Sequence, residues 1–310
     1  MTHAPDRRVP DSIPKTWVDR APEPIRPYLR LARYDRPIGF WLLAIPCWMG
    51  LALARVPEGL AWSDLWLAVL FGIGAVAMRG AGCTYNDIVD RDLDAQVART
   101  ADRPLAAGTV SLRRAWIFLV AQCLVGLAVL IQLPPLAILT GLAALVLVAG
   151  YPFMKRITWW PQAWLGLTFN WGIPVAYVAV AGGFDLAVAL LYAAAVFWTL
   201  GYDTIYACQD KEDDALVGVK SSARALGPNA KGGVAGFYVL TAALALAAGF
   251  AGGASPVFLI GAALFAAHLG WQAVRLDPED GALCLAIFKS NREAGLLLVL
   301  AYGLGAIPAS

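Results

Sequence analysis

Long runs of apolar residues, separated by short polar segments, dominate the pattern along the chain. A helix needs about 20 mostly apolar residues to cross a bilayer. Stretches of about this kind lie roughly at 38–54, 65–85, 115–132, 136–153, 163–180, 186–204, 234–252, 256–274 and 293–307. A membrane barrel would instead show short segments of alternating polarity. The pattern therefore predicts an all-α integral membrane protein with about nine transmembrane helices.

Composition agrees with this class, since 59% of the residues are hydrophobic and only 15% are charged. Residues 1–27 differ from the rest, because they are rich in proline and polar residues and contain no apolar signal segment. We expect a tail at 1–27 on the cytoplasmic side, with a surface helix near 24–35. A single transmembrane domain is expected at 28–310.

Lys and Arg residues are distributed unevenly between the two sides of the membrane that the expected helices would cross. If the helices alternate in direction, all of the 24 Lys and Arg residues except Arg55 and Arg79 fall on the side of the N-terminus. Positive residues gather on the cytoplasmic side of membrane proteins. Residues 1–27 also lack the Ser- and Arg-rich amphipathic character of a mitochondrial transit peptide. We expect a multi-pass protein of a bacterial cytoplasmic (inner) membrane, with its N-terminus and its chemistry facing the cytoplasm.

Two apolar runs end in similar acidic segments, YNDIVDRDLD from residue 85 and IYACQDKEDD from residue 205. Each places polar residues at i, i+4 and i+8, a spacing that puts them on one face of a helix. The residues are Asn86, Asp90 and Asp94 in the first segment and Tyr206, Asp210 and Asp214 in the second. The chain therefore reads as two pseudo-repeated halves whose acidic faces share a central cavity.

Carboxylates stacked on one face repel each other unless a cation screens them. Clusters of oxygen ligands without His or Cys suit Mg²⁺, which is commonly held by a few carboxylates together with substrate phosphates. Basic residues follow nearby and can hold phosphate oxygens: Arg99, Arg103, Lys155, Arg156 and Lys220. A substrate with a diphosphate head and a hydrocarbon tail fits this combination. The alternative is that the acids are solvated helix ends at the membrane edge.

The two acidic segments resemble the NDxxDxxxD and YxxxDxxxD signatures of the UbiA superfamily of intramembrane prenyltransferases. Further similar stretches include RTADRPLAAG at 99–108, YPFMKRITWWPQ at 151–162 and LTFNWGIP at 167–174. The resemblance covers about residues 28–310 and implies the UbiA-type fold around a central cavity. Within the superfamily, these stretches are most similar to the branch that transfers a polyprenyl group to 4-hydroxybenzoate in ubiquinone synthesis.

The resemblance also implies roles for particular residues. The catalytic aspartates would be Asp90, Asp94, Asp210 and Asp214, which with Asn86 would bind two Mg²⁺. The diphosphate would contact Arg99, Tyr151, Lys155 and Tyr206, and Arg103 and Lys220 complete the basic set. The implied substrates are a polyprenyl diphosphate and 4-hydroxybenzoate in membrane lipid, with no nucleic acid and no obligate protein partner.

Arg79 lies inside an apolar run, seven residues before Asn86 and therefore about two helical turns deeper. A charged residue within a membrane segment is costly and is a functional candidate by default. We expect Arg79 to hold the acceptor's carboxylate, with Arg156 as the second candidate. A salt bridge to a neighbouring helix is the structural alternative.

Two other functions remain open at this stage. The aspartate motifs are shared by UbiA-type enzymes that act on haem, homogentisate, dihydroxynaphthoate or chlorophyllide. A membrane transporter is a more distant alternative, because repeated halves and intramembrane charge also occur there.

Overall fold

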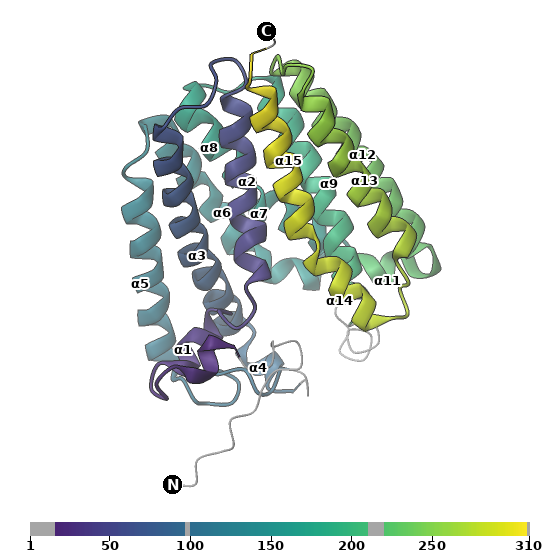
Figure 1. Cartoon of the computed structure of the whole chain (residues 1–310). Helices are drawn as coiled ribbons and strands as arrows, with labels where there is room; N and C mark the ends of the chain where they lie inside the picture. Colours follow the sequence, from purple (N-terminus) through teal and green to yellow (C-terminus); the bar gives the residue numbers. More distant parts are fainter. Residues whose placement is uncertain (1–15, 97–99, 210–219, 309–310) are drawn as a thin grey trace. The chain divides into compact units, whose positions relative to one another are not determined.

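The computed structural model describes residues 16–96, 100–209 and 220–308, apart from the side chain of Lys155. All regular structure in these residues is helical (Figure 1). The first half contains η1 (Trp17–Arg20), α1 (Arg26–Leu31), α2 (Ile38–Ala54), α3 (Ser63–Val89), α4 (Arg91–Asp94), α5 (Leu112–Leu130) and α6 (Pro135–Ile157). The second half contains α7 (Pro161–Phe169), α8 (Gly172–Ala181), α9 (Leu186–Cys208), α11 (Ser222–Leu226), η2 (Gly227–Asn229), α12 (Ala230–Ala251), α13 (Phe258–Arg275), α14 (Gly281–Lys289) and α15 (Asn291–Gly305). The prediction of an all-α protein is confirmed.

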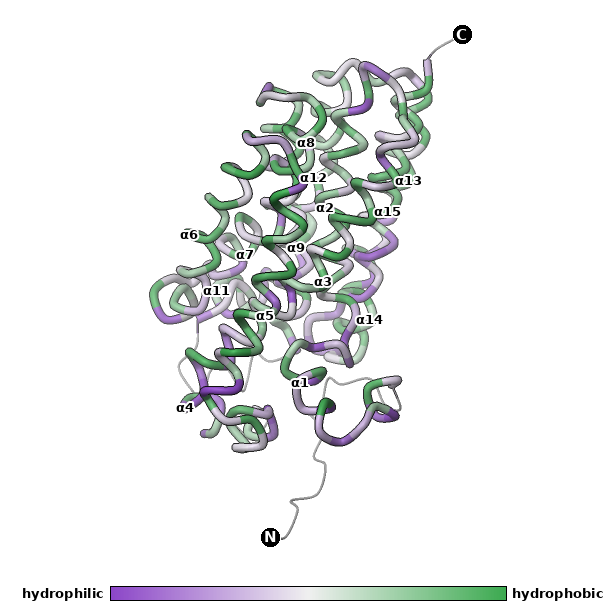
Figure 2. Tube along the Cα trace, turned by 90° about the vertical axis from the view of Figure 1, so that its left-hand side faces the viewer, coloured by the Kyte–Doolittle hydropathy of each residue, from purple (hydrophilic) through white to green (hydrophobic). Residues whose placement is uncertain are grey.

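Seven spans in the described residues are long and apolar enough to cross a membrane, and α2, with 17 residues, is shorter. The long helices are mostly green in Figure 2, whereas hydrophilic residues gather near α4. A helix occurs at each of the nine apolar stretches, but a count of nine spans is not confirmed. The last stretch shows why, because α15 has only 15 residues and carries Arg292 and Glu293 in its first turn.

The chain divides into two compact units. The first contains the N-terminal residues to Trp41 and Ile73–Val129, and the second contains Leu42–Gly72 and Leu130–Ser310. Both α2 and α3 run through the division, so each contributes one part to each unit. The two pseudo-repeated halves are not confirmed, and the acidic part of the second motif lies outside the described residues.

In the first unit, α1 and the loop after α4 close over one end of α3 and α5. Leu31, Leu105, Val110 and Ala115 form a small buried core there. Further along, α5 approaches α3 at Gly80, where a methyl group would lie 3.1 Å from the amide atoms of Gln122. Small residues let membrane helices pack this closely. The close packing fixes the end of α3 that carries the first acidic motif.

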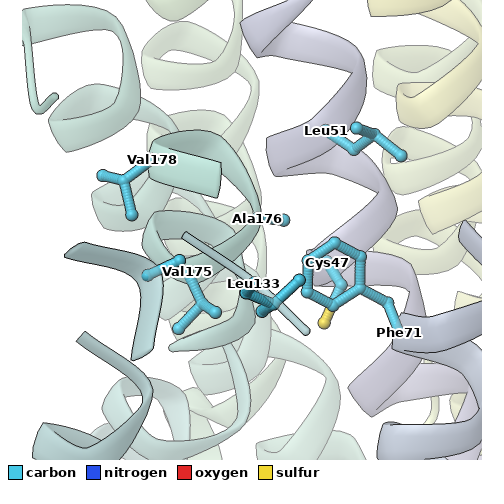
Figure 3. Packing of buried hydrophobic residues seen from close by; sticks show 8 residues of the cluster. Cys47, Leu51, Phe71, Leu133, Val175, Ala176 and Val178 are labelled. Atoms are coloured by element: carbon cyan, nitrogen blue, oxygen red, sulfur yellow. The ribbon is translucent and has the colours of Figure 1, made fainter. Parts of the chain in front are cut away.

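The second unit is organised around α9, which packs against α12 and α7, while α13 packs against α15. One of its apolar cores joins α2 to α8 and includes Cys47, Leu51, Phe71 and Val175 (Figure 3). These side chains fill the space between helices that are separate in the sequence.

The apolar stretch at 163–180 is broken into α7 and α8 at Asn170. The buried Asn170 amide donates to the Gly166 carbonyl at 2.8 Å, the Ala195 carbonyl at 3.0 Å and Thr199 Oγ1 at 2.8 Å. A break inside a membrane helix needs such partners, because lipid offers none to the freed backbone groups. Asn170 thus stabilises the break and ties it to α9.

Candidate active site

The first acidic motif begins in α3 and continues into α4 with a single turn between them. Asp90 N donates to the Asn86 carbonyl at 2.9 Å, and Asp94 N donates to the Asp90 carbonyl at 2.8 Å. These are helical i to i−4 bonds, so the backbone keeps its helical register through the turn. The structure therefore confirms that Asn86, Asp90 and Asp94 follow one helix face.

Burial distinguishes these acids from a solvated helix end. Asp87, Asp90 and Asp94 are buried, whereas Asp92 in the same segment is exposed. Burying a carboxylate is costly unless it is paired or hydrogen-bonded. The selective burial favours a built site over a charged membrane edge.

Two arginines partly neutralise this acidic cluster. Arg103 Nη1 donates to Asp94 Oδ2 at 2.8 Å and lies 3.3 Å from Asp87 Oδ1. Arg33 Nη2 contacts both Asp87 oxygens, at 2.7 and 2.9 Å. Arg103 was predicted to contact diphosphate, and here it holds carboxylates. Its buried Nε has no hydrogen-bond partner among the described residues, which leaves a donor for a phosphate oxygen.

Asp87 and Arg33 were not among the predicted site residues. Asp87 adjoins Asn86 inside the first acidic motif, so the sequence alone could have indicated it as a site residue. Arg33 is one of eight basic residues before Pro37, and nothing in the sequence distinguishes it from the others. Its role depends on a contact with a residue 54 positions away.

The cluster has the donor chemistry that Mg²⁺ prefers but lacks a complete cage. Burial raises the pKa of Asp94, the Asp87 and Asp90 carboxylates raise it further, and Arg103 opposes them. A divalent cation would relieve this crowding of negative charge. Within the described parts of the chain, no group of three or more His, Cys, Asp and Glu side chains is arranged to hold a metal alone. The oxygens of Asn86, Asp90 and Asp94 therefore fit part of a Mg²⁺ site.

The remaining predicted residues divide into two groups. Arg99, Asp210, Asp214 and the Lys155 side chain lie outside the described residues. Tyr151, Arg156, Tyr206 and Lys220 belong to the second unit. Their assignment to a shared site with the first motif stays a prediction.

The end of α9, where the second motif begins, is lined by aromatic rings. The rings of Tyr206 and Phe288 have centroids 4.7 Å apart, and those of Tyr202 and Phe288 are 5.9 Å apart. Phe288 comes from α14, so this helix supports the start of the second motif. Aromatic faces can also stabilise a nearby cation.

Hydroxyl and amide groups anchor the chain after the second motif. Thr204 Oγ1 and Ser222 Oγ share a hydrogen bond of 2.6 Å, and Ser222 N donates to Gln162 Oε1 at 3.0 Å. Lys220 Nζ donates to the Ile157 carbonyl at 3.1 Å, near the end of α6. The contact gives Lys220 a structural partner, while its diphosphate role remains a prediction. Arg156, the second candidate for the acceptor, is exposed.

Arg79 lies within α3 and is half-buried. Its guanidinium packs against Gly39 in α2, where an added methyl group would collide with Nε and lie 2.9 Å from Cζ. Glycine at this position leaves the room that the guanidinium occupies. Arg79 thus lies in α3 before the first motif, and its role toward the acceptor stays a prediction.

The described residues thus combine apolar helices long enough to span a membrane, buried carboxylates and adjoining arginines. The model of the UbiA prenyltransferase family matches residues 43–299. The chain belongs to this family and is an enzyme of the prenyltransferase class.

Individual relatives have names that are more specific than the family description. The chain is 49% identical over 290 residues to "4-hydroxybenzoate polyprenyltransferase, mitochondrial" of Rattus norvegicus, covering 93% of this chain and 77% of that protein. The human protein of the same name is 48% identical over 295 residues, with the same coverage. That of Arabidopsis thaliana is 44% identical over 292 residues, covering 94% of this chain and 71% of that protein.

Solved structures agree on the fold. The apo structure of a UbiA homolog from Aeropyrum pernix has a TM-score of 0.70 and 27% identity, covering 84% of this chain and 96% of that chain. A UbiA homolog from Archaeoglobus fulgidus bound to GPP and Mg²⁺ has a TM-score of 0.67 and 22% identity, covering 90% and 99%.

The prediction of a bacterial cytoplasmic membrane is contradicted by these comparisons. The relatives are named as mitochondrial proteins of animals and a plant, which points to a mitochondrial membrane. The prediction failed because an uneven charge distribution orients a protein in its membrane without identifying the membrane. The multi-pass character itself stands.

Proposed function

We propose that this enzyme transfers a polyprenyl group from polyprenyl diphosphate to the 3-position of 4-hydroxybenzoate, releasing diphosphate, in ubiquinone biosynthesis. The observation that carries the proposal is the set of relatives with this name, at 44–49% identity over more than nine-tenths of the chain. The buried acidic cluster beside Arg103 supports it, because a diphosphate leaving group needs cationic partners. We place the reaction in a mitochondrial membrane, after the relatives' names.

The metal set that we propose is Asn86, Asp90 and Asp94 from the first motif, with Asp210 and Asp214 from the second. Mg²⁺ would supply charge stabilisation to the departing diphosphate. The structure of the Archaeoglobus fulgidus homolog with GPP and Mg²⁺ supports divalent metal use in the family. Arg103 would donate its remaining Nε to the diphosphate, with Arg99, Tyr151, Lys155, Tyr206 and Lys220 as further contacts.

The reaction that we infer begins when the bond between the prenyl carbon and the diphosphate oxygen breaks. The electron pair leaves with the diphosphate, and an allylic cation remains. This cation needs a water-poor pocket lined by aromatic rings, because water would otherwise capture it. The ring carbon ortho to the phenol hydroxyl then bonds to the cation.

The ring carbon loses its proton to restore aromaticity. That proton passes to a second-motif carboxylate such as Asp210 or to the released diphosphate. We assign the acceptor's carboxylate to Arg79, which lies in α3 seven residues before Asn86. The phenol ring would then lie between Arg79 and the diphosphate site.

Purified protein in detergent, supplied with geranyl diphosphate and 4-hydroxybenzoate, tests the proposal. Mass spectrometry should detect 3-geranyl-4-hydroxybenzoate, and chelation of Mg²⁺ should abolish it. Asp90→Ala and Asp210→Ala should also lose the product, whereas the exposed Asp92→Ala variant should retain it. Detergent leaves no compartments, so product formation also excludes a purely transporting protein.

Assays with other aromatic acceptors test the choice of 4-hydroxybenzoate. If geranyl transfer occurs to homogentisate or dihydroxynaphthoate but not to 4-hydroxybenzoate, the proposed acceptor is wrong. If transfer to 4-hydroxybenzoate persists at full rate after chelation, the metal assignment is wrong.

A further inference from the structure

Arg33 has a backbone conformation that is unusual for its residue type. Its φ is 61°, and no other non-glycine residue in the described parts of the chain has a positive φ. The residue follows the end of α1, where Tyr34 N donates to the Leu29 carbonyl at 2.9 Å and Arg33 N to the Arg30 carbonyl at 3.0 Å. Glycine is the usual residue for a left-handed position at a helix end, because a side chain there is strained. An arginine at this position needs a compensating role for its side chain.

The Arg33 guanidinium has two sets of partners. Its Nη1 donates to the carbonyls of Arg30 and Leu31, at 3.1 and 3.4 Å, and so caps α1. Its Nη2 contacts both oxygens of Asp87, whose side chain is only 1% exposed. The same side chain therefore closes the helix end and neutralises a buried carboxylate of the first motif.

Asp87 connects Arg33 to the predicted metal ligands. Asp87 Oδ1 accepts from Arg33 and also lies 3.3 Å from Arg103 Nη1. The same Arg103 nitrogen donates to Asp94 Oδ2 at 2.8 Å. Positive and negative side chains thus alternate in a connected series of ion pairs, from Arg33 through Asp87 and Arg103 to Asp94.

We propose that Arg33 is a positioning residue for Asp94, acting through Asp87 and Arg103, and this inference rests on the proposed function. With Arg33 present, Asp87 is neutralised from one side, so Arg103 can share its Nη1 with Asp94. Without Arg33, Arg103 becomes the main partner of a buried carboxylate and moves toward Asp87. Asp94 then loses the hydrogen bond that orients its carboxylate, and metal affinity falls.

Arg33→Gly is the sharpest test, because glycine accepts the left-handed backbone and removes only the side chain. Mn²⁺ binding to the purified full-length protein, followed by electron paramagnetic resonance without substrates, gives a readout independent of activity. We expect the Mn²⁺ dissociation constant to rise about tenfold or more, as for other residues that orient metal ligands. The Mg²⁺ concentration needed for half-maximal turnover should rise in parallel, while the KM for 4-hydroxybenzoate stays close to that of the wild type.

Arg55→Gly is the matched control. Arg55 Nη2 pairs with Asp64 Oδ1 at 2.7 Å, with side chains 15% and 11% exposed, near the opposite end of α3. This substitution also breaks a half-buried arginine–aspartate pair, so it reproduces a general loss of stability. It should leave Mn²⁺ affinity unchanged.

Asp87→Asn removes the buried charge that would draw Arg103 away from Asp94 when Arg33 is absent. The double variant of Arg33→Gly and Asp87→Asn should therefore bind Mn²⁺ more tightly than Arg33→Gly alone. It also covers the case in which Arg33→Gly does not fold, because it leaves no unpaired carboxylate buried beside Arg103. Unchanged Mn²⁺ affinity in Arg33→Gly, no recovery in the double variant, or an equal loss in Arg55→Gly would overturn the positioning role.

Mn²⁺ binding to the wild-type protein and to Asp94→Ala distinguishes failure of the positioning role from failure of the proposed function. If the wild type binds no Mn²⁺ and Asp94→Ala changes nothing, the metal site itself is wrong and the positioning role falls with it. If the wild type binds Mn²⁺ and loses it in Asp94→Ala but not in Arg33→Gly, only the positioning role is wrong.

Discussion

The ends of α3 and α9 carry motifs of the same spacing but have different surroundings. At the end of α3, buried carboxylates are held by Arg33 and Arg103. At the end of α9, Tyr206 packs on Phe288, and Thr204 bonds to Ser222. Among the described residues, ion pairs are found at the first end, and ring packing with hydrogen bonds is found at the second.

This difference has an energetic consequence. Removing one partner of a buried ion pair leaves an uncompensated charge, while removing a ring leaves a cavity. Substitutions at α3 should therefore act mainly on metal affinity and turnover. Substitutions that remove the packing of Phe288 against α9 should act mainly on folding stability.

The largest effect is expected from Asp90→Ala and Asp94→Ala. Each removes a proposed metal ligand, so turnover should fall by about a hundredfold or more. Product formation from geranyl diphosphate and 4-hydroxybenzoate measures the loss. Asp92→Ala is the control within the same segment, and a similar loss in that variant would show that the motif acts through general charge.

Phe288→Ala should give the largest change in stability. It removes the ring that packs on Tyr202 and Tyr206, and truncation of a buried Phe costs about 3 kcal/mol or more. The unfolding temperature in detergent should fall, while the Mg²⁺ dependence of turnover changes little. Phe184→Ala, at a site 59% exposed, should leave the unfolding temperature unchanged. A large shift in Mg²⁺ dependence would break the proposed contrast between the two ends.

A smaller loss of stability is expected for Gln162→Leu. It leaves the buried Ser222 N without its acceptor, and a buried unsatisfied donor costs about 1–3 kcal/mol. Thermal unfolding measures the change, and Gln132→Leu, at an exposed position, provides the comparison. Equal unfolding temperatures in both variants would mean that the Gln162 bond contributes little.

The smallest effect is expected from Gly39→Ala in α2, which extends the comparison to Arg79 in α3. The new methyl group would displace the Arg79 guanidinium, so the KM for 4-hydroxybenzoate should rise several-fold while that for geranyl diphosphate stays constant. Gly82→Ala is the control, because a methyl group there meets nothing within 4 Å. Equal changes in both KM values would argue that Arg79 does not hold the acceptor.

Much of the fold followed from local pattern. Apolar runs placed a helix at each of the nine stretches, and the i, i+4, i+8 spacing placed Asn86, Asp90 and Asp94 on one face. The count of nine spans is not confirmed where length is marginal, since α15 has 15 residues. The break at Asn170 was missed, because its stabilising partners Ala195 and Thr199 come from another helix.

The sequence by itself determined the membrane class, the helices and the chemical character of the first motif, because hydrophobic periodicity and residue spacing are local properties. Only the tertiary structure decided which charges meet. Arg33 pairs with Asp87 across 54 residues, and Arg103 joins Asp87 to Asp94. Such pairings depend on the contact of three segments, which are the left-handed turn after α1, the end of α3 and the loop after α4. The spacing of residues along the sequence does not show which of these distant segments lie together.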